Sequence, residues 1–309
     1  MGAAPARRIS TAMAALDRFF APDSAFQKNF FFLAKRFVAG KSIADAMAVV
    51  RELNASGMSA SLDFLGEDVL ERHAALNTRD TYFTILDAVQ NSGVNSNVSV
   101  KLTALGLLID EDFAYQNFEA ILRRAQQNPD PFVRIDMEGS AVTDATLRLF
   151  ERAYAAHPNV GIVLQAYLKR TPLDVERAIE LRARVRLCKG AYNEPPSIAI
   201  KSMPEIRGQY MRCARELLTR GNYPGIATHD RRLIAAVKEF VRVNDIRRDR
   251  FEFQMIYGVR PNLQHQLVKE GYRLRVYVPF GTHWAAYFYR RVAERKENLL
   301  FALSSIFTR

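Results

Sequence analysis

The chain has 309 residues, of which 49% are hydrophobic and 25% are charged, and its formal net charge is +11. The hydrophobic content is enough for one large core or two ordinary ones. No uncharged run reaches 18 residues, so a membrane-spanning helix is not expected.

The two cysteines, Cys188 and Cys213, are too few for a disulfide framework. They are typical of a reducing compartment, and we expect two buried thiols in a cytoplasmic protein. Cysteine and histidine do not occur together at metal-ligand spacing anywhere in the chain. We therefore predict no metal site.

The positive charge is distributed unevenly along the chain. Residues 1–206 hold 24 basic and 24 acidic side chains, whereas residues 207–309 hold 20 basic and 9 acidic ones. Such a field could serve nucleic acid, an anionic membrane surface or an anionic ligand. A nucleic-acid module, a glycine-rich phosphate loop and an RGG tract are all missing from the sequence, so nucleic acid is not the predicted partner.

Residues 1–56 are predicted to form helices that pack on the domain that follows. Ile9, Met13, Leu16 and Phe20 have the spacing of an amphipathic helix, which we favour over a transit peptide. A second helix is predicted over 25–38, and Ser42 is expected to cap a third that ends near residue 54.

From residue 57 the chain repeats one unit, a short β-rich run followed by a helical stretch. The runs are 58–65, 97–104, 132–138, 160–167, 184–192, 225–229, 251–257 and 274–280. The helical stretches are 80–92, 112–127, 144–156, 174–183, 202–220, 230–243 and 262–270. This alternation predicts a closed (β/α)8 barrel over 57–309 in a one-domain protein. A doubly wound open sheet is the alternative, but a glycine-rich dinucleotide turn does not follow the first strand.

Polar residues alternate with apolar ones inside these strands, so the barrel interior should be charged. The inward set includes five cations and four anions: Lys101, Arg134, Arg184, Arg186, Arg275, Asp63, Asp136, Glu138 and Glu252. Buried charges must pair or contact a polar ligand. We expect Arg134, Arg184, Glu252 and Arg275 to be structural, and a charge-balanced site to form at the carboxyl ends of the strands, where barrel sites are built.

A final helix is predicted over 285–307, which contains neither glycine nor proline. Tyr287, Arg290, Arg291 and Glu294 fall on one side of it. The arginine pair could clamp a carboxylate while Glu294 meets a cationic nitrogen, a pattern suited to a small zwitterion. The alternative is an ordinary solvated, ion-paired helix face.

The strand ends together resemble flavin-dependent proline dehydrogenases, in order, from about residue 30 to 303. The resemblance rests on VKLTAL (100–105), RIDMEG (134–139), LQAYL (164–168), RLCKGAY (186–192), ATHD (227–230), FEFQMIYG (251–258), RVYVPFG (275–281) and YxxRRxxE (287–294). The length is similar to that of the monofunctional bacterial enzymes, because an aldehyde dehydrogenase region does not follow.

This resemblance implies FAD at the carboxyl face of the barrel, with Arg186 beside the flavin N5 atom. The residues implied in cofactor binding are Met137, Gln165, Arg186, Lys189, Gly190, Ala191, Tyr192, Thr228 and His229. Asn193 and the pair Val259-Arg260 depart from the family pattern near the outer cofactor, so the adenosine contacts stay open.

The resemblance also implies oxidation of L-proline to 1-pyrroline-5-carboxylate, the first step of proline catabolism to glutamate. Asp136 and Arg186 are the implied catalytic residues, and the implied substrate residues are Lys101, Ile256, Tyr277, Tyr287, Arg290, Arg291 and Glu294. A quinone is the implied electron acceptor, and a separate pyrroline-5-carboxylate dehydrogenase is expected downstream. The basic side chains of 207–309 could hold the enzyme peripherally at the inner face of the membrane.

Three other functions stay open at the level of sequence. One is a flavin barrel of the methylenetetrahydrofolate reductase type, which gives the arginine pair no role. Another is a metal-dependent hydrolase using Asp63, Asp136, Glu138 and His229, which a single usable histidine disfavours. The last is a basic binding protein without catalysis.

Overall fold

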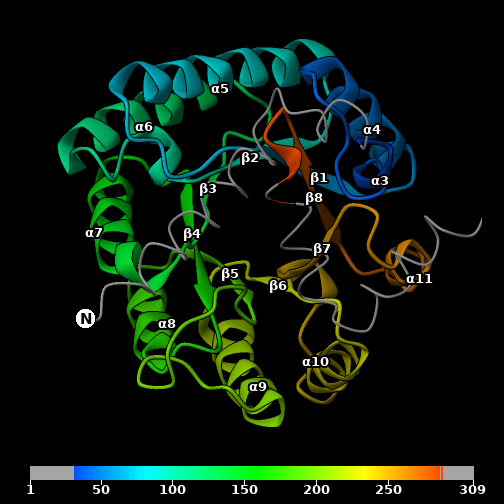
Figure 1. The fold of residues 1–309 in the computed structure, drawn as a ribbon. Coiled ribbons are helices and arrows are strands. Elements are labelled where there is room, and N and C mark those ends of the chain that lie inside the picture. Colours follow the sequence, from blue (N-terminus) through cyan, green and yellow to red (C-terminus); the bar gives the residue numbers. More distant parts are fainter. Residues whose placement is uncertain (1–30, 286, 288–309) are drawn as a thin grey trace, which may run out of the picture.

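The computed structural model describes residues 31–285 and 287. It contains a closed barrel of parallel strands in which each strand pairs with the next and β8 pairs with β1 (Figure 1). The strands are β1 (Ser59–Phe64), β2 (Ser96–Val100), β3 (Val133–Ile135), β4 (Val160–Gln165), β5 (Arg184–Cys188), β6 (Gly225–Ala227), β7 (Glu252–Ile256) and β8 (Leu274–Phe280). The (β/α)8 prediction is confirmed, and the open sheet is excluded because β1 and β8 are joined.

Helices surround the barrel in chain order (Figure 1). They are α3 (Phe31–Ala34), α4 (Ile43–Ala55), α5 (Arg72–Ser92), α6 (Glu111–Ala125), α7 (Ser140–Ala156), α8 (Thr171–Glu180), α9 (Met203–Arg220), α10 (Arg231–Val243) and α11 (Pro261–Lys269), with short 3-10 turns η1 (Thr103–Leu105) and η2 (Arg248–Arg250). The sequence predicted that α5 starts at Asp80, but it begins at Arg72 and buries Ala75 in the added turns.

The helix α4 packs against both β1 and β8, where they close the barrel. Ser42 begins it with a capping box: its hydroxyl accepts the Asp45 N–H at 3.1 Å, and the Asp45 carboxylate accepts the Ser42 N–H at 3.0 Å. This confirms the predicted cap. Because α4 lies between α5 and α11 in the ring (Figure 1), it occupies the place that the helix after β8 takes in a simple (β/α)8 barrel.

The chain after β8 packs instead on the N-terminal segment, at the carboxyl end of the barrel. Trp284 lies 5.4 Å from the Phe31 ring, centroid to centroid, and shares a small core with Ala34, Val38 and Leu65. Backbone bonds from Gly281 N–H to Gly40 O and from Ala39 N–H to Pro279 O, both 2.9 Å, fasten the two segments together.

Trp284, Ala285 and Tyr287 are helical, as expected for the start of the final helix. The helix predicted around Ile9–Phe20, and the side chains of Arg290, Arg291 and Glu294, lie outside the described residues. Among residues 31–285 and 287, none of the helices combines the length and the hydrophobicity that crossing a bilayer requires.

The outer face of the barrel is apolar, but its lower interior holds charged side chains. Arg275 Nε donates to Glu252 Oε1 at 2.9 Å, an ion pair between two of the four residues that were expected to be structural. Arg134 donates to the carbonyl oxygens of Ile162, at 3.1 Å, and of Arg184, and its guanidinium stacks on Phe132. Burial, together with the neighbouring Arg186 and Arg184, holds the pKa of Arg134 well below its usual value.

Gly161 makes room for this buried arginine, and this leads to a test. A Cβ at residue 161 would lie 2.5 Å from Arg184 O and 2.7 Å from Arg134 Nη1. Gly161→Ala should therefore cost about 1–3 kcal/mol of unfolding free energy in denaturant titrations. Gly208→Ala in α9, where a Cβ meets nothing within 4 Å, is the matched control and should be neutral or gain up to about 1 kcal/mol. Equal effects at the two sites would contradict this packing account.

Candidate active site

A buried quartet of two cations and two anions lies at the carboxyl ends of β1, β2, β3 and β5. Lys101 Nζ donates to Asp63 Oδ1 at 2.8 Å and lies 3.9 Å from Asp136 Oδ2. Arg186 Nη1 donates to Asp136 Oδ1 at 2.8 Å. The four charges balance, as buried charges must.

Asp136 joins the quartet to the wall of the site. Its Oδ2 atom accepts the Tyr277 hydroxyl at 2.7 Å, and the Arg186 guanidinium lies 5.2 Å from the Tyr277 ring centre. Burial raises the pKa of Tyr277 well above its ordinary value, and the neighbouring Asp136 charge raises it further, so the phenol stays a proton donor. Asp136 thereby orients Lys101, Arg186 and Tyr277 at once.

The charge on Lys101 is secured by its neighbours. Burial alone would lower the pKa of Lys101, but Asp63 and Asp136 outweigh it and raise that pKa. Burial raises the pKa of Asp136, although Arg186 and Lys101 act against this. A cation is therefore held at the mouth of the barrel without any ligand being needed to neutralise it.

The loop after β5 carries four of the predicted cofactor residues. Gly190 has φ +119°, and a Cβ there would lie 2.1 Å from the Tyr167 ring, so only glycine fits. Lys189 Nζ lies 3.6 Å from Asp230 Oδ2. Ala191 is exposed and Tyr192 half-buried.

Glu194 fastens this loop to α7. Its carboxylate accepts the Ser140 backbone N–H at 2.7 Å and the Ser140 hydroxyl at 2.5 Å. The residue before α7, Gly139, has no side chain to cap the helix, so Glu194 provides the cap from 54 residues along the chain. Lys201 in turn donates to the Glu194 carbonyl.

The other predicted cofactor residues lie at neighbouring strand ends. Gln165 and Met137 are both buried, and Gln165 donates to the Glu138 carbonyl at 3.0 Å. His229 Nε2 accepts the Ile256 N–H at 2.8 Å, so this nitrogen carries no proton. Thr228 is buried and accepts the Asp230 N–H at 3.1 Å.

The structure brings Lys101, Asp136, Arg186 and Tyr277 into direct or near contact. It places Ile256, half-buried, beside Tyr277 in the β7–β8 pairing, and Tyr287, 7% exposed, in the small core with Trp284. Arg290, Arg291 and Glu294 cannot be placed, because they lie outside the described residues.

The sequence assigns no role at this face to Glu194 or Gln254. It places Asp63 and Glu138 inside the barrel but does not predict their hydrogen-bond partners. Asp63 and Glu138 belong to the alternating polar set, which marks them as inward-facing. Nothing in the sequence marks Glu194, because its partner Ser140 belongs to another βα unit.

The donors of Arg186 fit a flavin. A guanidinium has five N–H donors. Arg186 Nε donates to Gln254, one N–H of Nη1 donates to Asp136, and one N–H of Nη2 donates to Ser61 at 3.4 Å. The remaining two have no partner in the part of the chain that the structure describes, and a flavin ring presents nitrogen and oxygen acceptors to such donors.

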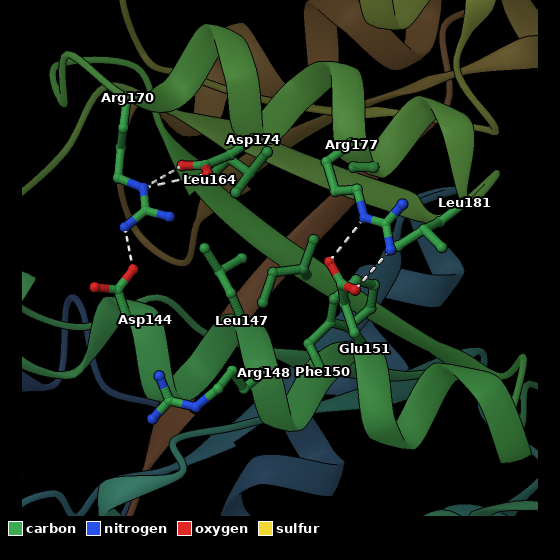
Figure 2. Close-up of a pocket in the computed structure, with 12 residues that line it drawn as sticks. Asp144, Leu147, Arg148, Phe150, Glu151, Leu164, Arg170, Asp174, Arg177 and Leu181 are labelled. Atoms are coloured by element: carbon green, nitrogen blue, oxygen red, sulfur yellow. Dashed lines mark hydrogen bonds and ion pairs between the residues drawn. The ribbon is translucent and has the colours of Figure 1, made fainter.

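A separate groove lies outside the barrel, between α7 and α8 (Figure 2). It has a volume of about 480 Å³, and Leu147, Phe150 and Leu164 form its floor. Arg177 pairs with Glu151 across the groove at 2.8 Å, and Arg170 pairs with Asp144 (Figure 2). Because these charges are already paired across the groove, it offers no group for catalysis.

Glu138 makes the stability of the fold depend on pH. Burial raises the pKa of its carboxyl to about 7, although the Thr103 hydroxyl, at 2.5 Å, acts against this. The ordinary value is 4.5, so the folded state binds the proton more tightly than the unfolded state. The stabilisation of the folded state by this proton is full below pH 4.5 and is lost as pH rises through about 7. The unfolding free energy changes by about 3 kcal/mol over this range.

Glu138→Gln should therefore flatten the decline in unfolding free energy over this pH window. Denaturant titrations at a series of pH values would measure it. Glu205→Gln, an exposed change in α9, should keep the wild-type slope. An unchanged slope in Glu138→Gln would show that another group causes the decline.

Known proteins resemble this chain in sequence and in fold. Residues 46–302 match the family model described as proline dehydrogenase. Proline dehydrogenase 1 of Bacillus subtilis is 40% identical over 276 residues, covering 88% of this chain and 90% of that protein. Proline dehydrogenase of Deinococcus radiodurans is 39% identical over 279 residues, with 89% and 90% covered.

Among solved structures, proline utilization A of Bdellovibrio bacteriovorus, inactivated by N-propargylglycine, superposes with a TM-score of 0.80 at 27% identity. The match covers 91% of this chain and 34% of the other, so this chain spans about a third of that longer protein. The family model covers most of the chain, and the two relatives match over nearly their whole length. The chain therefore belongs to the proline dehydrogenase family.

Proposed function

We propose that this protein oxidises L-proline to 1-pyrroline-5-carboxylate, with FAD as its cofactor and a quinone as its electron acceptor. Membership of the family supports proline oxidation, the first step of proline catabolism, and implies a flavin. The observation that carries the proposal is the buried quartet of Asp63, Lys101, Asp136 and Arg186 at the carboxyl face. It presents cationic donors where a zwitterion and a flavin would meet.

The cofactor would be held by the strand ends from β3 to β6. The free N–H donors of Arg186 and the amide of Gln165 would contact the ring, and Lys189 would supply positive charge for the pyrophosphate. When bound, FAD would accept a hydride from the proline carbon next to nitrogen. Arg186 would favour the electron-rich reduced ring, because a fixed cation stabilises developing negative charge.

Lys101 would bind the proline carboxylate together with Arg290 and Arg291. Asp136 and Asp63 hold the Lys101 ammonium from below, so its remaining donors are aimed at the mouth of the barrel. Glu294 would accept from the ring nitrogen. Tyr277, Tyr287 and Ile256 would wall the pyrrolidine and exclude water, which strengthens each charged contact.

A quinone would reach the protein from a membrane, and the basic residues of 207–309 could provide a peripheral contact. Several of them are, however, engaged within the protein: Arg242 pairs with Glu239, and Arg207 with Asp230. Such pairs reduce the positive charge available to a bilayer.

The proposed reaction predicts that L-proline bleaches the flavin absorbance of the purified protein in the absence of oxygen. Adding a short-chain quinone should restore the absorbance, because the reduced ring passes its electrons on. D-proline and glycine serve as controls that should act far more slowly. A colourless protein, or a flavin that proline leaves oxidised, would refute the proposal.

The substrate clamp predicts that Arg290→Met or Arg291→Met raises the KM for proline more than tenfold with flavin still bound. Losing one charged hydrogen-bond partner costs about 2–3 kcal/mol. Lys296→Met is the matched control, because it lies about 120–140° around the predicted helix from both arginines. A KM that stays at the wild-type value in both arginine variants would remove the clamp.

A further inference from the structure

A single amide lies directly against the candidate catalytic arginine. Gln254 of β7 accepts the Nε–H of Arg186 through its Oε1 atom. On its other side, its Nε2 atom donates to Glu252 Oε1 at 2.6 Å. The three residues are buried, with exposed fractions of 6% for Arg186, 4% for Gln254 and 3% for Glu252.

The chemistry of the two neighbours allows only one orientation of this amide. A guanidinium can only donate, and an ionised carboxylate can only accept. Glu252 is ionised: burial alone would raise its pKa, but Arg275, at 2.9 Å, together with Gln254 and Arg184, outweighs burial and lowers it. The amide oxygen must therefore face Arg186 and the amide nitrogen must face Glu252.

The adjacent strand is shaped around the same amide. A Cβ at Gly225 in β6 would lie 2.5 Å from Gln254 Nε2 and 2.8 Å from its Cδ atom. Gly225 does not have a positive φ. Glycine is therefore needed there for the space that a side chain would fill, and not for its backbone conformation. Two neighbouring strands thus hold Gln254 in one place.

The amide also separates two charges of opposite sign. Without it, the Glu252 carboxylate would be the natural partner of the Arg186 Nε atom. With it, Glu252 accepts from Arg275 and from the Tyr223 hydroxyl, the latter at 3.3 Å, and the Nε–H of Arg186 has a neutral acceptor. The only carboxylate within ion-pair distance of Arg186, among the residues described, is Asp136.

We propose that Gln254 is a positioning residue for Arg186. It fixes the plane of the guanidinium and insulates it from Glu252, so that its positive charge and two free N–H donors are directed to the ligand at the carboxyl face. The inference rests on the proposed function in taking that ligand to be a flavin.

Gln254→Glu in the flavin-loaded, full-length protein tests the insulation. A second carboxylate against Arg186 should cancel part of its charge and make the flavin harder to reduce. Against a reference redox dye at pH 8, the ratio of reduced to oxidised flavin should fall about tenfold, about 30 mV for a two-electron couple. Tyr223→Phe is the matched control, because it disturbs Glu252 from the far side and should leave this ratio unchanged.

Gln254→Met and Gly225→Ala test the fixed orientation without adding charge. The ¹⁵Nε–H signal of Arg186, assigned by its absence in Arg186→Lys, should be protected from exchange in the wild-type protein. Both variants should lose that protection, whether or not flavin is bound. They also provide an answer if Gln254→Glu does not fold.

The idea fails if these variants lower only the melting temperature, leaving both the flavin ratio and the Arg186 signal as in the wild type. Gln254 would then be a structural residue alone. Failure of the proposed function would look different, because the wild-type protein itself would carry no flavin that proline bleaches. The Arg186 signal would still decide the role of Gln254 in that case.

Discussion

The pairing of buried charge is the constraint on which the rest of this structure depends. Most barrels of this kind fill their interior with branched apolar side chains. Here the interior is crossed by polar contacts from Lys101 through Asp136 and Arg186 to Gln254 and Glu252. Each charge taken out of water costs several kcal/mol unless it is paired and hydrogen-bonded. The carboxyl face can therefore carry buried charges only because the quartet of Asp63, Lys101, Asp136 and Arg186 is balanced.

The network has two halves with different tasks. The lower half, built on Glu252 and Arg275, is closed on itself and supports the fold. The upper half, built on Asp136, leaves donors of Lys101 and Arg186 directed to the carboxyl face. Gln254 lies between the two halves. A neutral amide suits that position because it can hold the Arg186 guanidinium in one orientation without adding a charge beside it.

The surroundings of the site are positioned by contacts that are distant in sequence. The helix α4 takes the place in the ring beside β8, and the segment that begins at Trp284 packs on Phe31 and Leu65 at the carboxyl face. On the opposite side, Glu194 ties the loop after β5 to the first residue of α7. The Trp284 contacts and the Glu194–Ser140 contact each fix a chain segment at the carboxyl end of the barrel, where a cofactor and a small substrate would need enclosed space.

Consecutive residues alone encode the eightfold alternation of strands and helices and, in the strands with alternating polar residues, the side that faces inward. Both follow from local periodicity, which is written in consecutive residues. The sequence by itself also determined the family, because eight short motifs occur in order, and this was confirmed by the family model over residues 46–302. The predicted roles of the individual cofactor and substrate residues stay predictions, because they concern ligands rather than the fold.

Which charges pair depends on the closed barrel and cannot be read from neighbouring residues in the sequence. Lys101 lies closer to Asp63 than to Asp136, because the register of β1 against β2 brings Asp63 beside the end of β2. In the sequence Gln254 is one more polar residue of an alternating strand, and the stagger of β5, β6 and β7 places its amide against Arg186 and in the space that Gly225 leaves. Local sequence encodes the direction of a side chain, but the partner across a closed barrel depends on how the strands are staggered around it.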